Sequence, residues 1–202
     1  MMAAGNAPMD LTLTEAARPA AISDEALVER LRQGEAPAGD ELVRRHYPAL
    51  IRYLHRLTGS QGAADELHQQ TWMSVLEHLR RFDASGASGA FRAWLFRIAT
   101  NKANDLWRQR GRERTAKEGL RLIVEDHAPH AGAAAEGDEA AARLQRAIAR
   151  LPEAQQQVVL LRYYADMKFV DIARTLGCPL NTALGRMHKA MLKLKETLEQ
   201  EQ

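Results

Sequence analysis

Apolar residues recur along this chain with the 3.6-residue period of an amphipathic α-helix, from Ser23 to the C-terminal end. No segment alternates apolar and polar residues for long, and residues that favour strands are few. The pattern therefore predicts an all-α fold. The first helix is expected to follow Ser23, whose hydroxyl suits an N-cap, and to end before Gly34, which can adopt a left-handed backbone.

Three more helices are expected before residue 115, with loops at 34–40 and 83–90 between helices. Each helix has one apolar face, which predicts the residues of a shared core. The expected inward residues are Val43, Tyr47, Leu50, Leu54 and Leu57 in the second helix, Leu67, Val75, Leu76 and Leu79 in the third, and Phe91, Trp94, Leu95, Ile98 and Leu106 in the fourth. We therefore expect one compact helical domain over residues 23–114, preceded by a loose tail over 1–22.

The composition changes after the fourth helix. Residues 125–139, EDHAPHAGAAAEGDE, contain five acidic residues, no Lys or Arg, and no apolar period beyond alanine. Such a segment cannot bury enough apolar surface to form a core, so we expect an acidic flexible linker over 115–139. The helical pattern resumes near Ala140, which predicts a second small helical domain over 140–202.

The second domain contains the pattern of a helix-turn-helix. Gly177 suits the tight turn, Pro179 keeps the chain non-helical, and Asn181 is expected to cap the helix that follows. That last helix has an inward set and an outward polar set, which are Ala183, Met187, Ala190 and Leu194, and Thr182, Arg186, Lys189 and Lys193. The pattern is typical of the motif that lays its second helix in the DNA major groove, although structural helix pairs also carry basic outer faces.

The formal net charge of +2 conceals two basic segments. Residues 91–114 carry seven basic and two acidic residues, and the chain from Arg143 onward carries ten basic and six acidic ones. Unless these are only solvated surfaces, they favour a protein that contacts nucleic acid at two places, because clustered Lys and Arg neutralise phosphates. Trp107 and Phe96 lie in the first segment as candidates for base stacking, whereas Trp94 has the spacing of a core residue.

Other classes of protein find little support in the sequence. The single cysteine, Cys178, excludes an internal disulfide framework and fits a reducing compartment, so a cytoplasmic location is expected. No run of eighteen apolar residues occurs, so no membrane insertion is expected. The chain contains no phosphate-binding glycine loop or nucleophile motif, and we expect no enzymatic activity, cofactor or metal. Six residues could be imagined as metal ligands, but no pair of them has the close spacing, about two to four residues, of a structural zinc site. They are His46, His55, His68, His78, Cys178 and His188.

Four stretches, in the same order, resemble the extracytoplasmic-function (ECF) group of bacterial sigma factors, a subfamily of the sigma-70 family. They are ADELHQQTW at 64–72, WLFRIATNKANDLWRQR at 94–110, LPEAQQQVVLLRY at 151–163 and DIARTLGCPLNTALGRMHKA at 171–190. The resemblance covers roughly Ser23 to Leu198. It implies two helical domains, a four-helix region 2 over 23–114 and a helix-turn-helix region 4 over 140–202.

The resemblance implies a sigma factor, a non-catalytic subunit that directs core RNA polymerase to specific promoters and helps to open them. Region 2 would bind the clamp helices of the largest subunit, and its loop at 83–90 would capture a flipped base. The implied polymerase-binding residues are Asp65, Glu66, Gln69 and Gln70. The implied residues for the minus-ten element are Arg97, Asn101, Lys102, Asp105 and Arg108.

Region 4 would bind the flap of the second-largest subunit and the minus-thirty-five element of promoter DNA. The implied DNA-binding residues are Asn181, Thr182, Leu184, Arg186 and Lys189. The chain departs from the family at Leu184 and Gly185, where lysine and serine are usual, and at Gln70, which is usually acidic. We therefore expect hydrogen-bonded base readout to fall mainly on Arg186, since leucine can only meet a thymine methyl.

Two further points stay open at the level of sequence. An anti-sigma factor is a candidate partner, and the acidic linker is either a spacer or an occupant of a polymerase channel.

The alternative hypothesis is a free-standing regulator that uses only the C-terminal helix-turn-helix, with the N-terminal helices as a sensor or dimerisation module. The basic helix at 91–114 favours the sigma factor, because a sensor needs no second nucleic-acid face.

Overall fold

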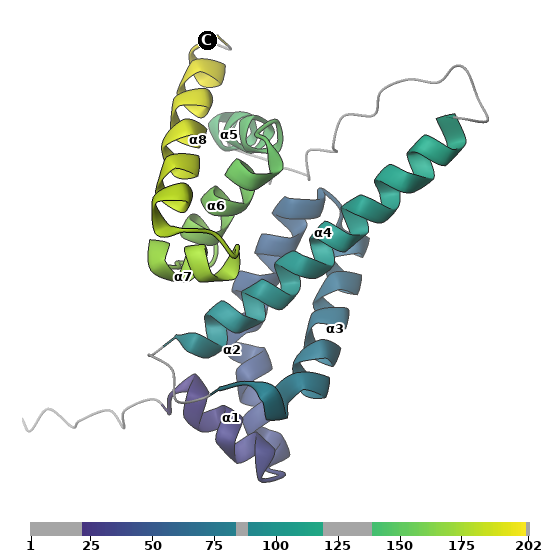
Figure 1. The fold of residues 1–202 in the computed structure, drawn as a ribbon, viewed down its shortest axis with the longest axis vertical. Coiled ribbons are helices and arrows are strands. Elements are labelled where there is room, and N and C mark those ends of the chain that lie inside the picture. The colour runs from purple at the N-terminus through teal and green to yellow at the C-terminus, as the bar shows by residue number, and fades with distance from the viewer. Residues whose placement is uncertain (1–21, 84–88, 119–138, 201–202) are drawn as a thin grey trace, which may run out of the picture.

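The structure is a computed structural model that describes residues 22–83, 89–118 and 139–200, with the side chains of 113–118 left undescribed. Within these ranges every regular element is a helix, as the apolar period predicts (Figure 1). The elements are α1 (Asp24–Arg32), α2 (Ala36–Thr58), α3 (Gln61–His78), the 3₁₀ turn η1 (Leu79–Arg81), α4 (Ala90–Glu118), α5 (Glu139–Ala149), α6 (Glu153–Tyr163), α7 (Phe169–Thr175) and α8 (Leu180–Gln200).

Local residue chemistry sets most of the helix ends. Ser23 caps α1 as predicted, because its Oγ accepts a hydrogen bond from the Ala26 N–H at 3.2 Å. Gly34 and Gly59 follow α1 and α2 with φ of +92° and +67°, a conformation that costs glycine little. The loop predicted at 34–40 is largely wrong, since α2 already begins at Ala36 with a proline in its first turn, where no N–H is needed.

Helices α1 to α4 share a core built around Tyr53, Phe91 and Phe96, all fully buried. The Tyr53 hydroxyl lies 2.8 Å from Thr100 Oγ1, so its polar atom is paired inside the core. Most of the predicted inward residues are buried or packed against this core. Tyr47 and Leu76 are wrong, with 46% and 56% of their surface exposed, and Val43 is only half-buried. Each stands next to the buried side of its helix, about 100° away around the axis.

The aromatic residues of α4 do not divide into core residues and candidates for base stacking as predicted. Phe96 packs edge-on against Tyr53 at 5.4 Å between ring centroids, so it is a core residue and is not free to stack on a base. Trp107 is half-buried against the core.

The fourth helix also continues to Glu118, beyond the predicted end at 114, so residues 115–118 of the expected linker are helical. Glu139, the last residue of the expected linker, is helical too, since α5 begins there. Residues 119–138 of the linker and 1–21 of the expected tail lie outside the described residues.

Helices α5 to α8 form the second helical unit. Its interior includes four consecutive residues of α6, Val158 to Leu161, none of which is more than 2% exposed. On α8 the predicted inward residues Ala183, Ala190 and Leu194 are buried, and Met187 packs against them half-buried, which confirms the inward face. Gly177 has a φ of +59° at the turn after α7, as the helix-turn-helix pattern requires.

The two units are in direct contact, a feature that the sequence did not predict. Helices α6 and α7 lie against α2 and α4 (Figure 1). The Thr175 hydroxyl on α7 donates to the Ala93 carbonyl on α4 at 3.3 Å, and the side-chain amides of Gln157 and Asn104 meet at 2.7 Å. The second unit therefore rests on α4 through both apolar packing and paired polar groups.

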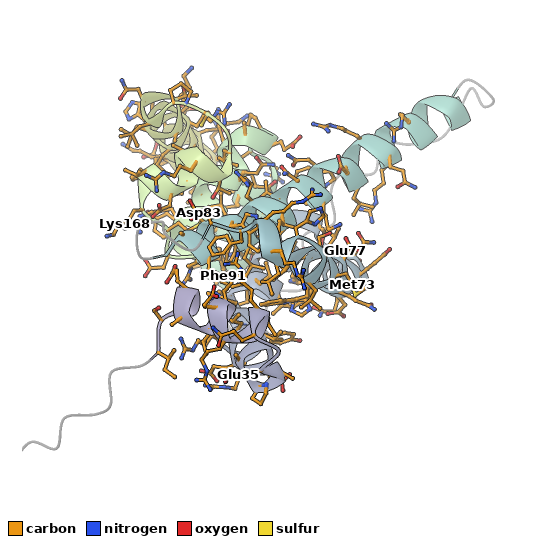
Figure 2. The ribbon with its side chains drawn as sticks, turned by 60° about the horizontal axis from the view of Figure 1, so that its bottom comes forward. Glu35, Met73, Glu77, Asp83, Phe91 and Lys168 are labelled. Atoms are coloured by element: carbon orange, nitrogen blue, oxygen red, sulfur yellow. The ribbon has the colours of Figure 1, made fainter. Side chains whose placement is uncertain are left out.

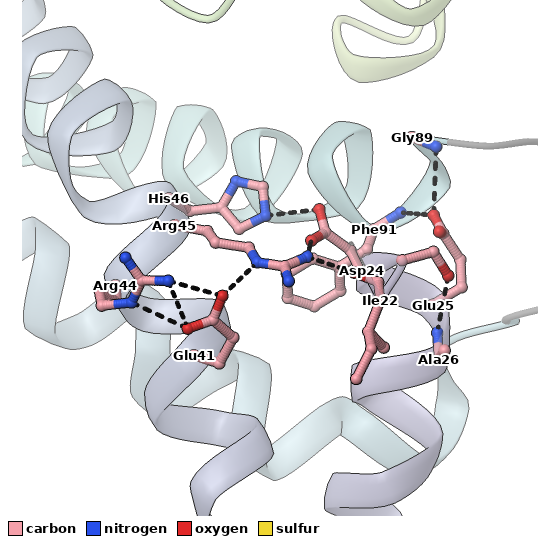
Figure 3. A network of polar contacts seen from close by, with 11 residues as sticks. Ile22, Asp24, Glu25, Ala26, Glu41, Arg44, Arg45, His46, Gly89 and Phe91 are labelled. Carbon is pink, nitrogen blue, oxygen red and sulfur yellow. Dashed lines mark hydrogen bonds and ion pairs between the residues drawn. The ribbon is translucent and has the colours of Figure 1, made fainter. Parts of the chain in front are cut away.

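A polar network ties α1 to α2 (Figure 3). The Asp24 carboxylate lies 2.7 Å from His46 Nε2 and accepts a hydrogen bond from Arg45 at 3.2 Å. Burial alone would raise the pKa of Asp24, but the hydrogen bonds and charges of His46 and Arg45 outweigh burial and hold that pKa below its usual value. A carboxyl group whose pKa falls on folding stabilises the fold while it is ionised.

We expect Asp24→Asn to destabilise the protein at pH 7. The wild type should lose this stabilisation as the pH falls below the ordinary aspartate range of about 4, so the two free energies of unfolding should converge in acid. Urea unfolding between pH 7 and pH 3 measures both effects. Asp105→Asn is the control, because its ion pair with Arg108 is 71% exposed on both sides and such surface pairs contribute little. A constant difference between Asp24→Asn and wild type at every pH would contradict the assignment.

Candidate nucleic-acid and partner interface

One exposed face of α3 carries the four residues that the sequence assigned to a polymerase contact. Asp65, Glu66, Gln69 and Gln70 are all exposed, and their spacing places them on one side of the helix. Gln61 donates to Asp65 at 2.9 Å and Gln70 donates to Glu66 at 3.0 Å, so both carboxylates are steadied by neighbours four residues away. The face offers ionised oxygen acceptors to a partner with exposed Arg or Lys.

This face continues with apolar residues that sequence reasoning did not assign to it. Met73 and Leu76 are 53% and 56% exposed, and Figure 2 labels Met73 and Glu77 on the outer side of α3. Exposed apolar side chains next to polar ones are common in protein interfaces. The signal in the sequence was ambiguous, because the helical period made Leu76 equally suitable for the core.

Beneath the α3 face lies a small aromatic cluster. The Trp72 indole N–H donates to His68 Nε2 at 3.1 Å, and the Tyr47 ring stands edge-on to His68 at 4.9 Å. Burial lowers the pKa of His68, against the opposing effect of the Asp65 carboxylate. A neutral imidazole is also what the Trp72 contact needs, since its Nε2 must accept. His68 is thus a packing residue of the α3 face.

Four of the five predicted minus-ten residues form an exposed stripe along α4. Arg97, Asn101, Asp105 and Arg108 are spaced by four, four and three residues, and all are exposed. Arg108 donates to Asp105 at 3.2 Å, which leaves the carboxylate partly neutralised within the stripe. Arginine and asparagine on such a surface suit contacts to phosphate and to base edges.

Lys102 lies to one side of that stripe, in a groove between α3 and α4 with a volume of about 260 Å³. The groove is also lined by Glu66 and Gln70 of the α3 face and by Asp105. The structure therefore brings members of the two predicted sets, one for polymerase and one for DNA, into a single groove.

A cavity of about 310 Å³ lies at the beginning of α4. Its walls from the first unit include Phe82, Ala90, Trp94 and Arg97, and the rings of Phe82 and Trp94 contact each other at 4.9 Å between centroids. Aromatic surface beside an arginine can hold an unstacked base and its phosphate. Five residues of the loop predicted to capture a flipped base, 84–88, lie outside the described residues.

The second unit supplies the remaining wall of this cavity. Arg174 and Thr175 of α7 line it opposite α4, and Thr175 is only 4% exposed because α4 covers it. Sequence reasoning could not find these two residues, since they are about eighty positions from Ala93 along the chain. We name this space, lined by both units, the α4–α7 cavity.

The predicted reading face of α8 is accessible. Asn181, Thr182, Leu184 and Lys189 are exposed, and Arg186 is half-buried. The prediction that Asn181 caps α8 is wrong: the helix already begins at Leu180, and the N–H groups of Thr182 and Ala183 bond to the Pro179 carbonyl at 2.9 and 3.1 Å. Since proline fixes its own φ near the helical value, the helix can begin two residues earlier than an asparagine cap at 181 would place it.

The two departures from the family pattern both face outward. Leu184 is 41% exposed and Leu180, four residues earlier, is 42% exposed, so they form a short apolar row. A Cβ atom added at Gly185 would meet nothing within 4 Å, so internal packing does not require glycine there. Any requirement for Gly185 must therefore come from something that approaches α8 from outside.

Two further patterns concern the described residues, that of a metal site and that of a membrane-spanning helix. In that part of the chain no three His, Cys, Asp or Glu side chains gather in a way that could hold a metal ion. Three of the described histidines have other contacts: His46 lies against Asp24, His68 accepts from Trp72, and His78 Nδ1 lies 2.9 Å from the Ser74 carbonyl. Of the helices described, none is both long enough and apolar enough to cross a bilayer.

Comparison with known proteins gives matches to both units. Residues 42–113 match the family model of sigma-70 region 2, and residues 141–194 match that of sigma-70 region 4. The ECF RNA polymerase sigma factor SigE of Mycolicibacterium smegmatis is 32% identical over 82% of this chain, which spans 63% of SigE. The RNA polymerase sigma factor NccH of Alcaligenes xylosoxydans xylosoxydans is 31% identical over 89% of this chain and 96% of NccH.

A solved structure is similar in fold. It is the sigma factor RpoE in complex with the anti-sigma factor NepR from Bartonella quintana, with a TM-score of 0.65 and 26% identity. The match covers 79% of this chain and 96% of the RpoE chain. The alignment is too long to lie within one of the two helical units alone.

We expect a cysteine pair across the α4–α7 cavity, Ala93→Cys with Thr175→Cys, to be joined within one chain by a short bismaleimide. The native thiol is first removed as Cys178→Ala, and the product is read as a faster-migrating band in denaturing gels. The reason is that the Thr175 hydroxyl oxygen lies 3.3 Å from the Ala93 carbonyl oxygen, so the two positions are close in the folded chain. The control pair, Asp65→Cys with Lys189→Cys, places thiols on the exposed faces of α3 and α8. Equal yields from both pairs would contradict the packing of the two units.

Proposed function

Because the chain belongs to the ECF subfamily of the sigma-70 family, we propose that it is a non-catalytic initiation subunit that directs core RNA polymerase to specific promoters and helps to open them. The observation that carries this proposal is the presence of two separate outward faces suited to DNA, on α4 and α8, in addition to the acceptor-rich face of α3. A free-standing regulator would need only α8. The match of residues 42–113 to region 2 also disfavours that alternative.

The polymerase contact is assigned to the exposed face of α3. Asp65, Glu66, Gln69 and Gln70 would receive hydrogen bonds from basic residues of the clamp helices of the largest subunit, and Met73 would add apolar contact beside them. The second unit would bind the flap of the second-largest subunit. Two well-separated contacts of this kind raise the overall affinity, because the second binding event takes place within the complex.

Promoter opening is assigned to α4 and the α4–α7 cavity. Arg97, Asn101, Asp105 and Arg108 would follow one strand, with Lys102 at the edge of the stripe, and Trp94 with Phe82 would offer a surface to an unstacked base. Taking a base out of the stack costs a few kcal/mol, and stacking with charged contacts can offset that cost. DNA can use this cavity fully only after α7 moves away from α4, since Arg174 and Thr175 form its other wall.

The minus-thirty-five element is assigned to α8. Arg186 would read a base edge, while Asn181, Thr182 and Lys189 would contact the backbone. Leu184 would meet a thymine methyl, and Gly185 would let the phosphate backbone approach the helix closely, since no described residue lies within 4 Å of a Cβ placed there. With this division of roles, α8 would read DNA without the usual lysine and serine.

Regulation by an anti-sigma factor is part of the proposal. The similar RpoE structure holds such a partner, and the exposed apolar residues of α3 and α8 offer it surfaces on both units. We further propose that the protein acts in the cytoplasm, where core polymerase is found, and needs no cofactor or metal of its own.

A reconstituted reaction tests the function. Purified core polymerase with this protein should give promoter-specific transcripts from a library of genomic fragments, and core polymerase alone should not. Glu66→Arg should weaken binding to core polymerase by roughly tenfold or more, because it reverses a charge at the proposed contact. Glu196→Arg, an exposed charge reversal on α8, is the matched control for that variant. No complex and no specific transcript with the wild-type protein would overturn the proposal.

The assignments on α8 predict two different defects. Arg186→Ala should relax specificity at the minus-thirty-five element, with a loss of about 1–3 kcal/mol on the matched sequence and little on a mismatched one. Lys189→Ala should weaken binding equally on both sequences and reduce the salt dependence by about one phosphate contact. Titrations of holoenzyme on matched and mismatched promoter fragments at several salt concentrations measure both. Equal losses on both fragments for Arg186→Ala would refute its role in reading bases.

A further inference from the structure

Helix α1 contacts the chain on both sides of the segment 84–88. At its C-terminal end, the Arg32 guanidinium donates two hydrogen bonds to the Leu79 carbonyl, at 2.8 and 3.2 Å, and another to the Phe82 carbonyl. At its N-terminal end, the Glu25 carboxylate accepts from the backbone N–H groups of Gly89 and Phe91, at 3.2 and 3.4 Å (Figure 3). One short helix thus holds the residues that precede the segment and the residues that follow it.

The spacing of the two side chains explains how α1 can do this. Glu25 and Arg32 are seven residues apart, so they lie on the same side of the helix, about 10 Å apart along its axis. Each meets the backbone groups that suit its charge: the guanidinium takes the carbonyls of the first residue of η1 and of the residue that follows η1, and the carboxylate takes N–H groups at the start of α4. The Arg32 side chain is only 20% exposed, so water competes little for its contacts.

Helix α1 is itself held firmly to α2. The contacts of Asp24 with His46 and Arg45 fix its first turn, and Arg45 also donates to Glu41 at 2.6 Å (Figure 3). Leu27 and Val28 are buried in the core on the inner side of α1. The helix can therefore serve as a rigid reference for the chain that it contacts.

The backbone held by α1 forms walls of the α4–α7 cavity. Phe82 and Asp83 line one side of it, and Ala90, Ala93 and Trp94 line the side that belongs to α4. Gly89 has a φ of +88°, so the chain turns sharply into α4 at the point where Glu25 contacts it. A shift at either end would change the separation between Phe82 and Trp94, which determines the shape of the cavity.

We propose that Glu25 and Arg32 are positioning residues for promoter opening: together they brace the two ends of the 84–88 segment and keep the cavity walls spaced to receive an unstacked base. The proposal rests on the proposed function, because the cavity serves opening only if the chain is a sigma factor. Neither side chain need touch DNA. Their contribution is to hold the backbone around Phe82 and Gly89 in place before DNA arrives. The entropy cost of ordering that backbone is then not added to the free energy of the step in which DNA melts.

A first test uses the free protein and does not depend on polymerase. Glu25→Ala should speed amide hydrogen exchange at Gly89 and Phe91, because their acceptor is lost, whereas Glu25→Gln should keep most of the protection through its amide oxygen. Arg30→Ala is the matched control: Arg30 also lies on α1, but its side chain pairs with the nearby Glu35 at 2.6 Å. Unchanged exchange in Glu25→Ala would overturn the brace, whatever the protein does with polymerase.

The second test compares two templates with reconstituted holoenzyme, using a promoter from which the wild type initiates. One template is fully duplex and the other carries a pre-opened bubble at the minus-ten region. Glu25→Ala and Arg32→Ala should lower the duplex-to-bubble ratio of transcripts by roughly five- to thirtyfold, the effect of one or two lost interactions of this kind. Arg30→Ala should leave the ratio unchanged, and Arg32→Lys, which has a point charge without the planar fork, should fall between.

The ratio separates positioning from general destabilisation, because partial unfolding or weak polymerase binding lowers transcription from both templates equally. Equal ratios in wild type, Glu25→Ala and Arg32→Ala would overturn the proposal, as would a loss in Arg30→Ala as large as theirs. If Glu25→Ala or Arg32→Ala fails to fold, Glu25→Gln and Arg32→Lys supply the same comparison. Altered exchange in Glu25→Ala together with no transcript from wild-type holoenzyme would uphold the brace and reject the sigma-factor function.

Discussion

The burial of one side of α4 is the constraint on which the rest of the structure depends. Phe91, Leu95, Phe96 and Ala99 have no exposed surface, and they anchor the helix against α1, α2 and α3. Because successive residues turn by about 100° around the helix axis, fixing the buried side of α4 also fixes the directions in which its two remaining sides face. One of them, at Ala93 and Asn104, receives the second unit, and the other carries the stripe from Arg97 to Arg108 to the surface.

The same constraint shapes the α4–α7 cavity. Phe91 contacts both Phe82 and Trp94, with ring centroids 5.8 and 6.0 Å apart, so the core of the first unit extends directly into the cavity wall. With α7 packed on α4, this cavity is covered on one side, while the α3 face and the reading face of α8 stay exposed. The arrangement leaves the proposed polymerase and minus-thirty-five surfaces accessible at the same time as it restricts the proposed site of opening.

Particular residues show how far the sequence could predict this structure. The helical period located all four helices of the first unit and the inward face of α8, because an apolar stripe has few other ways to be buried. It misplaced Tyr47 and Leu76, since a residue at the edge of a stripe is buried only if a neighbouring helix happens to cover it. It likewise could not tell that Phe96 is core and that Lys102 lies in the groove with Glu66 and Gln70.

By itself the sequence determined the all-helical class, the capped start of α1, the glycine turn before α8 and the order of the motifs that relate this chain to the sigma-70 family. These depend on local preferences and on residue identity, which tertiary contacts do not alter. Only the tertiary structure decided the packing of α6 and α7 on α4, the walls of the cavity, and the contacts of Glu25 and Arg32 with backbone more than forty residues away. Such contacts join groups whose nearness follows from how whole helices pack, and no short pattern in the chain encodes that geometry.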